Sequence, residues 1–497
     1  MGDHDIVAAT LAEHSERLYV YEFEGMYVSG KWSPTSGPPI EVRSPADGEL
    51  LGRVGEATAA DVAVVVEAAR TALEHGPWQS STAAIRAQAI TALADAIGAR
   101  TKELADVVSA EVGSPRKWTT FGQLATALGV YRACAAIVED YEFEERRPSA
   151  TGGEVLVRRL PVGVVGAIVP WNAPLFTAAL KMAPALAAGC TIVLKPSPEA
   201  PLALSMLAEC IEEAGIPAGV INIVSGGVAT GAALVAHPGV DKISFTGSTA
   251  AGKQIGAACA QDVRRVTLEL GGKSAAVVLD DVVVDATLIN GLVTGVMANN
   301  GQICAAQTRI LLPRSCYDEI LEPFAAAVSA MRIGDPAERD TEVGPVINAA
   351  SRDRIENAVA GAVDAGARLV AGGTRPDGFD SGSYVSPTVL ADVDNDMAIA
   401  RDELFGPVAV VIAYDDENDA VAVANDSEYG LAGAVWSADP VRASRVAARI
   451  RTGSVSINSA APLDFGSPFG GFKKSGIGRE GGPEGIAAYL ESQSIIL

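Results

Sequence analysis

Histidine is scarce in this sequence: a chain of 497 residues contains four, His4, His14, His75 and His237. None of them lies in a motif that would pair it with a nucleophile, so a cysteine–histidine hydrolase is poorly supported. Cysteine is also sparse, and none of the six cysteines forms a Cys-x-x-Cys pair. Zinc and dithiol redox sites are therefore disfavoured, no metal site is expected, and the few cysteines fit a reducing cytoplasm.

Positive charge is in short supply as well. The formal net charge is −23, and no long basic tract reverses it locally. An acidic surface repels phosphate backbones, so no nucleic-acid partner is expected. The start, "MGDHDIVAATLAEHSERLYV", lacks the basic and apolar regions of a secretory signal, which again favours the cytoplasm.

One uncharged stretch is long enough to cross a bilayer. Residues 160–180 read "LPVGVVGAIVPWNAPLFTAAL". Pro170, Asn172 and Pro174 interrupt any helix there, so we expect a buried strand, a loop and the start of a helix. No membrane partner is expected.

The order of apolar runs predicts an α/β fold. Residues 58–111 carry apolar residues at helical spacing, and from about residue 162 short β-branched runs alternate with helical segments. Such runs are typical of a parallel sheet covered on both faces, hence a doubly wound unit. A second α/β region is expected from about 270 to 470, with a helix near 284–299, and the apolar tail "SQSIIL" is expected to pair with another strand.

The segment "NNGQICAAQTR" places Cys304 among small residues, as if a ligand must approach closely. A thiol is mostly protonated at neutral pH and needs a base to become a nucleophile. A buried structural cysteine is the simpler alternative.

The segment "SFTGSTAAGKQ" nearly matches a phosphate-binding loop. Gln254 stands where a magnesium-binding hydroxyl is required, so a nucleotide triphosphatase is disfavoured. The turn from a strand into a helix can still hold a pyrophosphate on backbone N–H groups, although no Gly-x-Gly-x-x-Gly motif is present. A simple tight turn remains the alternative.

Three further side chains follow predicted strands. Lys195 can reach ligand oxygens at the carboxyl edge of the sheet, or is a solvated loop lysine. Glu269 ends an apolar strand and is either a general base or a satisfied structural acid. Asn172 lies in the rigid loop "VPWNAP", which can aim its amide at an oxyanion.

Together the motifs "PWN", "KPS", "FTGST", "LELGGK", "GQIC", "ELFGP" and "PFGGFKKSGIGRE" resemble the NAD(P)-dependent aldehyde dehydrogenase superfamily, from about residue 25 to the end of the chain. The resemblance implies Cys304 as the catalytic thiol, Glu269 as the general base and Asn172 as an oxyanion donor with the backbone N–H of Cys304. It also implies Lys181 as a residue that supports the site. The implied contacts to NAD, with NADP as the alternative, are Val169, Pro170, Trp171, Lys195, Ser197, Gly226, Phe245, Gly247, Ser248, Leu270, Gly271, Glu403 and Phe405.

The family's mechanism then implies a sequence of steps. The thiolate attacks an aldehyde, the thiohemiacetal loses hydride to the nicotinamide, and water activated by Glu269 hydrolyses the thioester. A CoA-acylating semialdehyde dehydrogenase is one alternative, disfavoured because that branch generally lacks the acid. A catalytically silent structural relative is another, disfavoured by the intact residue set.

Two positions depart from the common pattern. Pro198 stands where many NAD-preferring members carry the acid that bonds the adenine ribose, and Glu199 comes one step later. This leaves the choice between NAD and NADP open. Ala173 and Leu180 stand where bulky aromatics are common, which suggests a roomier substrate tunnel.

The resemblance also implies three parts. They are a cofactor domain of residues 1–145 and 160–269, a catalytic domain of residues 270–475, and a small β arm of residues 146–159 and 476–497. Members of the family are dimers or tetramers, so a homo-oligomer acting on a small aldehyde is expected.

Overall fold

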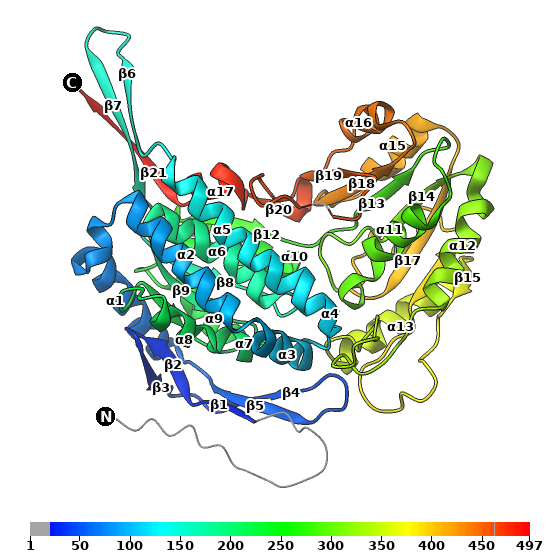
Figure 1. Ribbon diagram of the computed structural model, residues 1–497, viewed down its shortest axis with the longest axis horizontal. Coiled ribbons are helices and arrows are strands. Elements are labelled where there is room, and N and C mark those ends of the chain that lie inside the picture. The colour runs from blue at the N-terminus through cyan, green and yellow to red at the C-terminus, as the bar shows by residue number, and fades with distance from the viewer. Residues whose placement is uncertain (1–19, 462) are drawn as a thin grey trace.

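Two lobes of unequal size make up the body, and a narrow β arm projects from the larger one (Figure 1). The computed structural model describes residues 20–461 and 463–497. The polar start of the chain, on which the expectation of no secretory signal rests, lies outside these residues.

The larger lobe is built on an eight-stranded sheet with the order β20-β12-β11-β8-β9-β10-β2-β3. Its five central strands are parallel, and β20, β2 and β3 pair antiparallel at the two ends. The strands are β20 (Gly476–Ile477), β12 (Arg265–Glu269), β11 (Lys242–Thr246), β8 (Val164–Ile168), β9 (Thr191–Lys195), β10 (Ile221–Ile223), β2 (Gly25–Val28) and β3 (Lys31–Pro34). Apolar side chains on both faces explain why β8, β9 and β10 are buried along their whole length.

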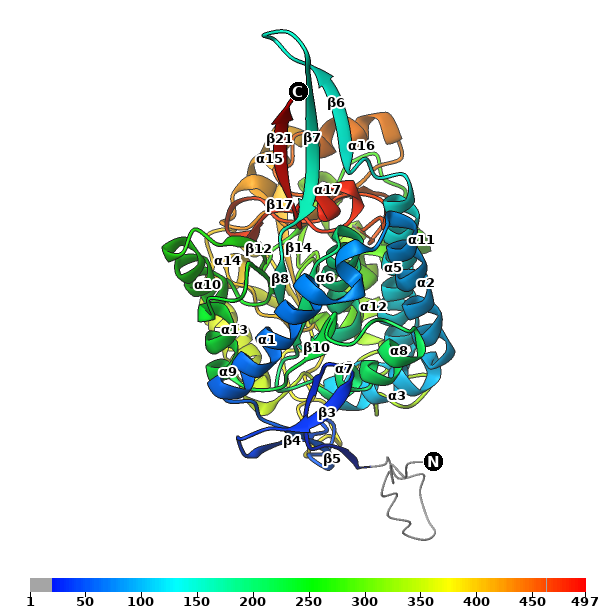
Figure 2. The ribbon, with the colours of Figure 1, turned by 90° about the vertical axis from the view of Figure 1, so that its left-hand side faces the viewer.

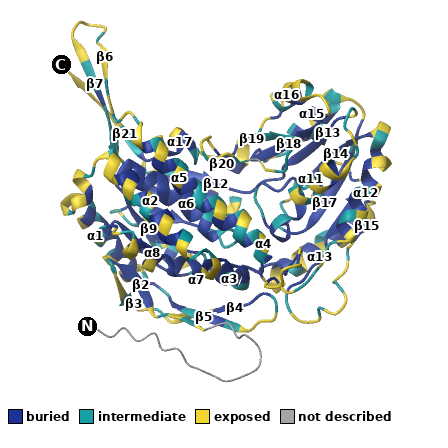
Figure 3. Ribbon diagram, in the orientation of Figure 1, coloured by how far each residue is buried: buried dark blue, intermediate teal, exposed yellow. Residues whose placement is uncertain are grey.

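Helices cover both faces of this sheet, as the doubly wound prediction requires (Figures 1 and 3). They are α1 (Ala59–His75), η1 (Pro77–Ser80), α2 (Ala83–Ala99), α3 (Thr101–Val112), α4 (Arg116–Trp118), η2 (Thr119–Leu124), α5 (Ala125–Glu139), α6 (Pro174–Ala188), α7 (Leu202–Ser205), α8 (Leu207–Glu213), α9 (Val228–Ala236), α10 (Thr249–Gln261) and α17 (Gly482–Ala487). The central helix is α6, which has Pro174 in its first turn and ends at Gly189 in the left-handed conformation (φ 90°). Nearly every residue of α6 is buried, so its side chains are held rigidly.

The uncharged stretch of residues 160–180 is divided between the end of β7 (Glu154–Pro161), β8 and the start of α6. A different helical run, Arg116–Glu139, is long and apolar enough by length and composition to cross a membrane. This run packs against α2 and α6 through α5, as a core helix of a folded domain does.

The smaller lobe holds a seven-stranded sheet with the order β15-β16-β17-β14-β13-β18-β19, antiparallel only at β15. The strands are β13 (Ala275–Val278), β14 (Arg309–Pro313), β15 (Arg368–Ala371), β16 (Thr388–Ala391), β17 (Val408–Tyr414), β18 (Ala432–Trp436) and β19 (Ser454–Ile457). The helices are α11 (Ala286–Met297), η3 (Ala298–Gly301), η4 (Arg314–Cys316), α12 (Tyr317–Ser329), α13 (Ala349–Asp364), α14 (Ala398–Arg401), α15 (Glu417–Asn425), α16 (Pro440–Ala447) and η5 (Lys473–Ser475).

The helix expected over residues 284–299 ends earlier than predicted. It ends at Met297, because Asn299 and Asn300 take left-handed φ values of 53° and 58°. Asparagine tolerates this conformation better than most residues. The two residues turn the chain sharply into the loop that carries Cys304.

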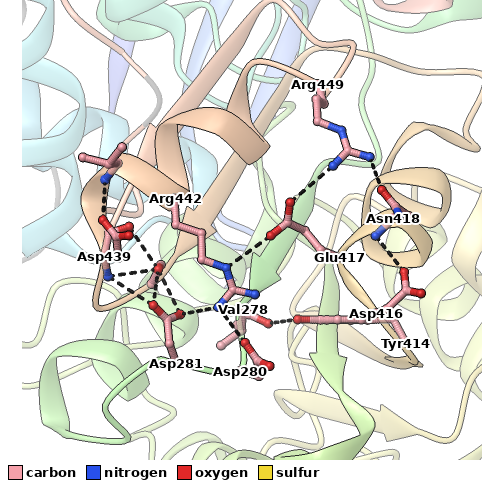
Figure 4. A network of polar contacts seen from close by, with 12 residues as sticks. Val278, Asp280, Asp281, Tyr414, Asp416, Glu417, Asn418, Asp439, Arg442 and Arg449 are labelled. Carbon is pink, nitrogen blue, oxygen red and sulfur yellow. Dashed lines mark hydrogen bonds and ion pairs between the residues drawn. The ribbon is translucent and has the colours of Figure 1, made fainter.

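Charged side chains fill the carboxyl edge of the smaller sheet (Figure 4). Arg442 pairs with Asp280 at 2.6 Å and with Glu417 at 3.2 Å, and Arg449 also reaches Glu417 at 3.3 Å. Ligands of open α/β sheets usually bind at such an edge. Here ion pairs occupy that edge. The chain from the larger lobe enters the smaller sheet at its opposite edge, where β13 and the parallel strand β14 begin.

The arm is a three-stranded antiparallel sheet of β6 (Glu144–Pro148), β7 (Glu154–Pro161) and β21 (Leu490–Ile496), and it stands clear of the body in Figure 2. The apolar tail therefore pairs with β7. The arm boundary drawn at residue 476 does not match this pairing, because β20 extends the larger sheet and α17 packs on α5 and α6. A further small sheet, β1 (Tyr21–Phe23), β5 (Leu50–Gly55) and β4 (Pro39–Arg43), lies beneath the larger lobe.

Candidate active site

Three loops meet where the two lobes face each other. One follows β8, one joins β12 to β13, and one leads from η3 into β14. The Asn172 side chain of the first loop donates to the carbonyl of Gln302 in the third, at 2.8 Å. In the second loop, a Cβ added to Gly272 would lie 2.4 Å from the carbonyl oxygen of Cys304, so only glycine permits this approach. The site thus joins carboxyl ends of one sheet to amino ends of the other.

Cys304 lies at the centre of these loops and is partly exposed. With Ile303 and Leu463 it packs against an apolar cluster that includes Leu431 and Phe469. Burial is the main cause that raises the pKa of the Cys304 thiol to about 12, and the charges of two nearby glutamates add to it. The resting thiol is therefore protonated at neutral pH and needs a base.

Asn172 is buried, and its side chain contacts the loop that carries Cys304. Its backbone carbonyl accepts side-chain N–H groups from Asn299 at 2.9 Å and from Gln123 at 3.3 Å, which hold the loop, while its side-chain amide donates to the carbonyl of Gln302. An amide NH₂ has two donor hydrogens, and Gln302 takes one. The second hydrogen remains available to a ligand oxygen at Cys304.

Glu269 ends β12 and is buried, with 3% of its surface exposed. Neither carboxylate oxygen has a hydrogen-bond partner among the described residues. Burial raises the pKa of Glu269 well above its ordinary value, the charge of Glu480 raises it further, and Lys181 and Arg479 lower it. A buried carboxylate without a partner is costly, so this side chain is better explained by a reaction than by packing.

Lys181 forms a fully buried ion pair with Glu480, at 2.6 Å, and also donates to Thr246 Oγ1 at 2.6 Å. Lys181 was expected to support the site, whereas Glu480, the last residue of "GIGRE", was assigned no role from its motif. A lysine inside an apolar helix signals that some carboxylate must lie opposite. The sequence does not tell which of many acids it is.

Glu403 reaches into the cleft from the smaller lobe. Its carboxylate accepts the backbone N–H of Gly272 at 3.0 Å, and a Cβ on Gly271 would lie 2.1 Å from it. Burial raises the pKa of Glu403 to about 7, against the opposing effects of the Gly272 bond and of Lys273. The carboxylate therefore lies directly on a glycine backbone, at the mouth of the cleft.

Phe405 follows in the unusual left-handed conformation, with φ 57°, and meets Trp171 edge to face at 5.5 Å between ring centroids. A non-glycine residue held at positive φ is strained, which is typical of functional loops. The Trp171–Phe405 contact joins the larger lobe to the smaller one beside Glu403.

The helix α10 begins at the same cleft. Ser248 caps it by accepting the N–H of Ala251 at 3.2 Å, and the Phe245 ring packs so closely on Gly247 that a Cβ there would lie 2.5 Å from it. A helix of this length presents free N–H groups and a positive dipole end at its start. The arrangement can hold a pyrophosphate.

Lys195 ends β9 beside the start of α9. It is buried, with 4% exposed, and donates to the carbonyl of Pro196 at 2.8 Å. Ser197 bonds the carboxylate of Glu199, and Gly226, at φ 159°, lies so close to Thr230 that a Cβ would be 2.0 Å from its hydroxyl. These residues lie at and after the ends of β9 and β10, on the carboxyl edge of the larger sheet.

The remaining predicted residues are held by main-chain bonds. The N–H of Val169 donates to Lys195 at 3.1 Å, Leu270 donates to Ser475 at 2.8 Å, and Pro170 lies between Val169 and Trp171. Most of the predicted cofactor contacts thus follow the carboxyl ends of β8, β9, β10, β11 and β12, at one edge of the larger sheet.

The residues along this sheet edge have the chemistry to hold a dinucleotide. Glycines 226, 247 and 271 each lie where an added side chain would collide with a neighbouring residue, the α10 start offers N–H groups, and Glu403 and Lys195 offer an acceptor and donors for ribose hydroxyls. Within residues 20–461 and 463–497, no group of three or more metal-binding side chains forms a candidate metal site.

Comparisons with known proteins agree with this geometry. The model of the "Aldehyde dehydrogenase family" matches residues 32–495. The chain is 47% identical over 477 residues to a geranial dehydrogenase of Castellaniella defragrans, covering 96% of this chain and 99% of the relative. It is 41% identical to a 3-succinoylsemialdehyde-pyridine dehydrogenase of a Pseudomonas species, covering 96% and 98%.

A solved structure is also similar. The crystal structure of a Mycobacterium tuberculosis aldehyde dehydrogenase complexed with NAD+ matches with a TM-score of 0.94 and 46% identity, over 96% of this chain and 99% of that one. The cleft and the fold thus define a dinucleotide-dependent oxidoreductase with a cysteine at its centre. The chain belongs to the aldehyde dehydrogenase family and oxidises an aldehyde to a carboxylic acid with NAD(P)+.

Proposed function

We propose that Cys304 is the nucleophile of this oxidation, Asn172 an oxyanion donor and Glu269 the general base. The observation that carries this assignment is the unpartnered, buried carboxylate of Glu269 in the neighbourhood of the thiol. A carboxylate with a raised pKa is a stronger base than an exposed one, and it can accept protons near neutral pH. No histidine is needed in such a site.

Glu269 acts first on the thiol. Its carboxylate accepts the proton of Cys304, directly or through one water, and the thiolate attacks the aldehyde carbon. The carbonyl oxygen becomes an oxyanion, which accepts the second amide hydrogen of Asn172 and the backbone N–H of Cys304. Removing one such donor typically costs about 2.7–4 kcal/mol of barrier.

The bound cofactor supplies a hydride acceptor. Glu403 would accept hydrogen bonds from the nicotinamide ribose, Ser248 and the start of α10 would hold the pyrophosphate, and Lys195 would donate to the adenine ribose. The edge-to-face pair of Trp171 and Phe405 would close the nicotinamide end of the cleft.

Glu269 acts again on the thioester. The proton it took from Cys304 first passes to solvent, so the carboxylate is free again. It then takes a proton from the water that attacks the acyl carbon, the C–S bond breaks to release the acid, and Glu269 returns this proton to the Cys304 thiolate. The buried pair of Lys181 and Glu480 sets the electrostatic field in which Glu269 gains and loses protons.

The substrate we propose is an aldehyde with an apolar tail. Cys304 packs, with Ile303 and Leu463, against the apolar cluster that contains Phe469. Leu180, which replaces a bulky aromatic, lines a narrow cavity with Val130, Phe465 and other apolar neighbours. The 47% identical relative is named a geranial dehydrogenase, and geranial is itself an apolar aldehyde.

We also propose a cytoplasmic homo-oligomer assembled through the arm. Ile496 and Leu497, at its end, are 77% and 58% exposed. Exposed apolar residues on an open strand edge favour pairing with a second copy. Light scattering after size exclusion tests this, and a monomer at micromolar concentration contradicts it.

Absorbance at 340 nm tests the activity. Purified protein with NAD+ or NADP+ is given straight-chain aldehydes of increasing length, then branched and aromatic ones. We expect reduced cofactor to form and the rate constant at low substrate, kcat/KM, to rise with tail length. A flat response from acetaldehyde to octanal contradicts the apolar tail, while no reduction with any aldehyde contradicts the activity.

A further inference from the structure

Two carboxylates lie close enough to Lys195 for their charges to raise its pKa, and they come from chain segments that are distant in sequence. Glu56 lies between β5 and α1, and its carboxylate accepts the N–H of Gly227 at 3.2 Å, next to the start of α9. Glu199 lies on the loop after β9 and accepts the hydroxyl of Ser197. The Lys195 stem lies against α9, where a Cβ on Gly231 would be 3.5 Å from Lys195 Cε.

We propose that Glu56, supported by Glu199, makes the adenosine end of this cleft select NAD over NADP. The two acids take the place of the acid that is missing at Pro198. Glu56 comes from the segment between β5 and α1, and Glu199 is the residue that follows Pro198. This inference rests on the proposed function, because it requires Lys195 and the α9 start to receive the adenine ribose.

Glu56 is the stronger candidate of the two because it is fixed. It is half-buried, and one oxygen is held by Gly227, which leaves its second oxygen for a ligand. Glu199 is exposed and lies on a loop. Its charge is better screened, so its effect is smaller.

Neither charge is neutralised by the lysine between them. In the described part of the chain, no ion pair within 4.0 Å joins Lys195 to Glu56 or to Glu199. The charges of both acids nevertheless raise the pKa of Lys195, although burial dominates and lowers it to about 8. The surroundings of Lys195 therefore contain two carboxylates and one lysine, whose pKa is lowered so that it is only partly protonated near pH 8.

This charge balance discriminates between the two cofactors. A ribose 2′-hydroxyl donates a hydrogen bond to a carboxylate, which favours NAD. A 2′-phosphate carries close to two negative charges and is repelled by the same carboxylate. In a water-like dielectric, removing one such carboxylate changes the affinity for the phosphate about tenfold.

Isothermal titration calorimetry without aldehyde measures the binding itself. NAD+ and NADP+ are titrated into the full chain and into Glu56→Gln, Glu199→Gln and Glu338→Gln. The glutamine at position 56 keeps an oxygen for the Gly227 N–H. Glu338 is an exposed acid of the smaller lobe, so its variant controls for net charge alone. Circular dichroism and thermal melting check the fold of each variant.

We expect wild type to bind NAD+ at least about tenfold more tightly than NADP+. Glu56→Gln should bind NADP+ about tenfold more tightly than wild type does, Glu199→Gln about threefold, and Glu338→Gln without change. Glu56→Asp, which keeps the charge, should retain the preference for NAD+.

Other outcomes overturn the inference. Equal affinities in wild type, or an unchanged ratio in Glu56→Gln, would show that these acids do not select the cofactor. An equal loss of both affinities in Glu56→Gln would show that Glu56 only supports the α9 start. If wild type binds neither cofactor, both the proposed function and this inference fail. If it binds both cofactors equally tightly, only the inference about selectivity fails and the proposed function stands.

Discussion

The buried ion pair of Lys181 and Glu480 should affect both the stability of the protein and the pH dependence of its turnover. The side chains are 0% and 1% exposed, and the charged atoms are 2.6 Å apart. Lys181→Met leaves the Glu480 carboxylate buried without its cation, and Glu480→Gln leaves the ammonium without its anion. Breaking a buried pair in this way costs about 3–5 kcal/mol.

The double variant separates pairing from packing. With both charges removed, neither is stranded, so Lys181→Met/Glu480→Gln should cost less than the sum of the single variants, by about 2 kcal/mol or more. At about 2 °C per kcal/mol for a large domain, each single variant should lower the melting temperature by about 6–10 °C. Differential scanning fluorimetry at fixed protein concentration measures this. Strictly additive shifts would contradict the pairing.

The same two variants should move the pH dependence of turnover in opposite directions. The charge of Glu480 raises the pKa of Glu269 and that of Lys181 lowers it. Glu480→Gln should therefore shift the acidic limb of the kcat profile to lower pH, and Lys181→Met to higher pH. A purely structural role predicts lower rates with no such opposite shifts, and that result would refute the electrostatic reasoning.

Four further predictions follow from the site and the arm. Cys304→Ala should bind cofactor in calorimetry but give no absorbance at 340 nm, and turnover equal to wild type would remove Cys304 as the nucleophile. Glu269→Gln should retain part of the acylation burst while steady turnover stalls, and unchanged steady rates would exclude Glu269 as the base. The folded protein raises the pKa of Glu269 above 4.5, so the protonated carboxyl stabilises the fold fully below pH 4.5 and this stabilisation is lost as pH rises through the folded pKa. A plot of melting temperature against pH should therefore lose this slope in Glu269→Gln. Asn172→Ala should lower kcat about 10²- to 10³-fold, whereas a change confined to KM would argue against an oxyanion role. Deleting residues 490–497 should reduce the mass measured by light scattering to that of a monomer, and an intact oligomer would place the interface elsewhere.

Much of the fold could be predicted because its signals are local. The alternation of short β-branched runs with helical segments from about residue 162 predicted the doubly wound sheet, and β8, α6, β9, α9, β11 and α10 follow that alternation. The end of α11 was missed because two asparagines at left-handed φ override the helical pattern. The boundary at residue 476, where the second segment of the arm was expected to begin, does not match the structure. Residues 476–477 form β20, which pairs with β12 of the larger sheet, and no local pattern reveals so short a strand.

Cys304, Glu269, Asn172 and Glu403 were expected from their motifs, and their functional roles stay predictions. The structure adds contacts that the sequence did not indicate: Asn172 donates to Gln302, Glu403 accepts the Gly272 N–H, and the charges of Glu403 and Glu269 add to the burial that raises the pKa of Cys304. Glu480 was missed as the partner of Lys181, because the pair spans 299 positions in the chain.

The amides that hold the Asn172 loop, those of Asn299 and Gln123, were missed for the same reason. Long-range partners depend on the folded path of the chain rather than on local sequence. The acid opposite Lys195, Glu56, comes from a segment in which no motif was found at all.

Intact-protein mass spectrometry of Glu269→Gln, mixed briefly with octanal and oxidised cofactor and quenched in acid, shows whether Cys304 carries the acyl group. We expect a mass increase of one acyl group, located by peptide mapping on Cys304 alone, that requires the cofactor and is absent from Cys304→Ala/Glu269→Gln. Turnover with no acyl group on the protein, or with the acyl group on another residue, would show that Cys304 is not the nucleophile.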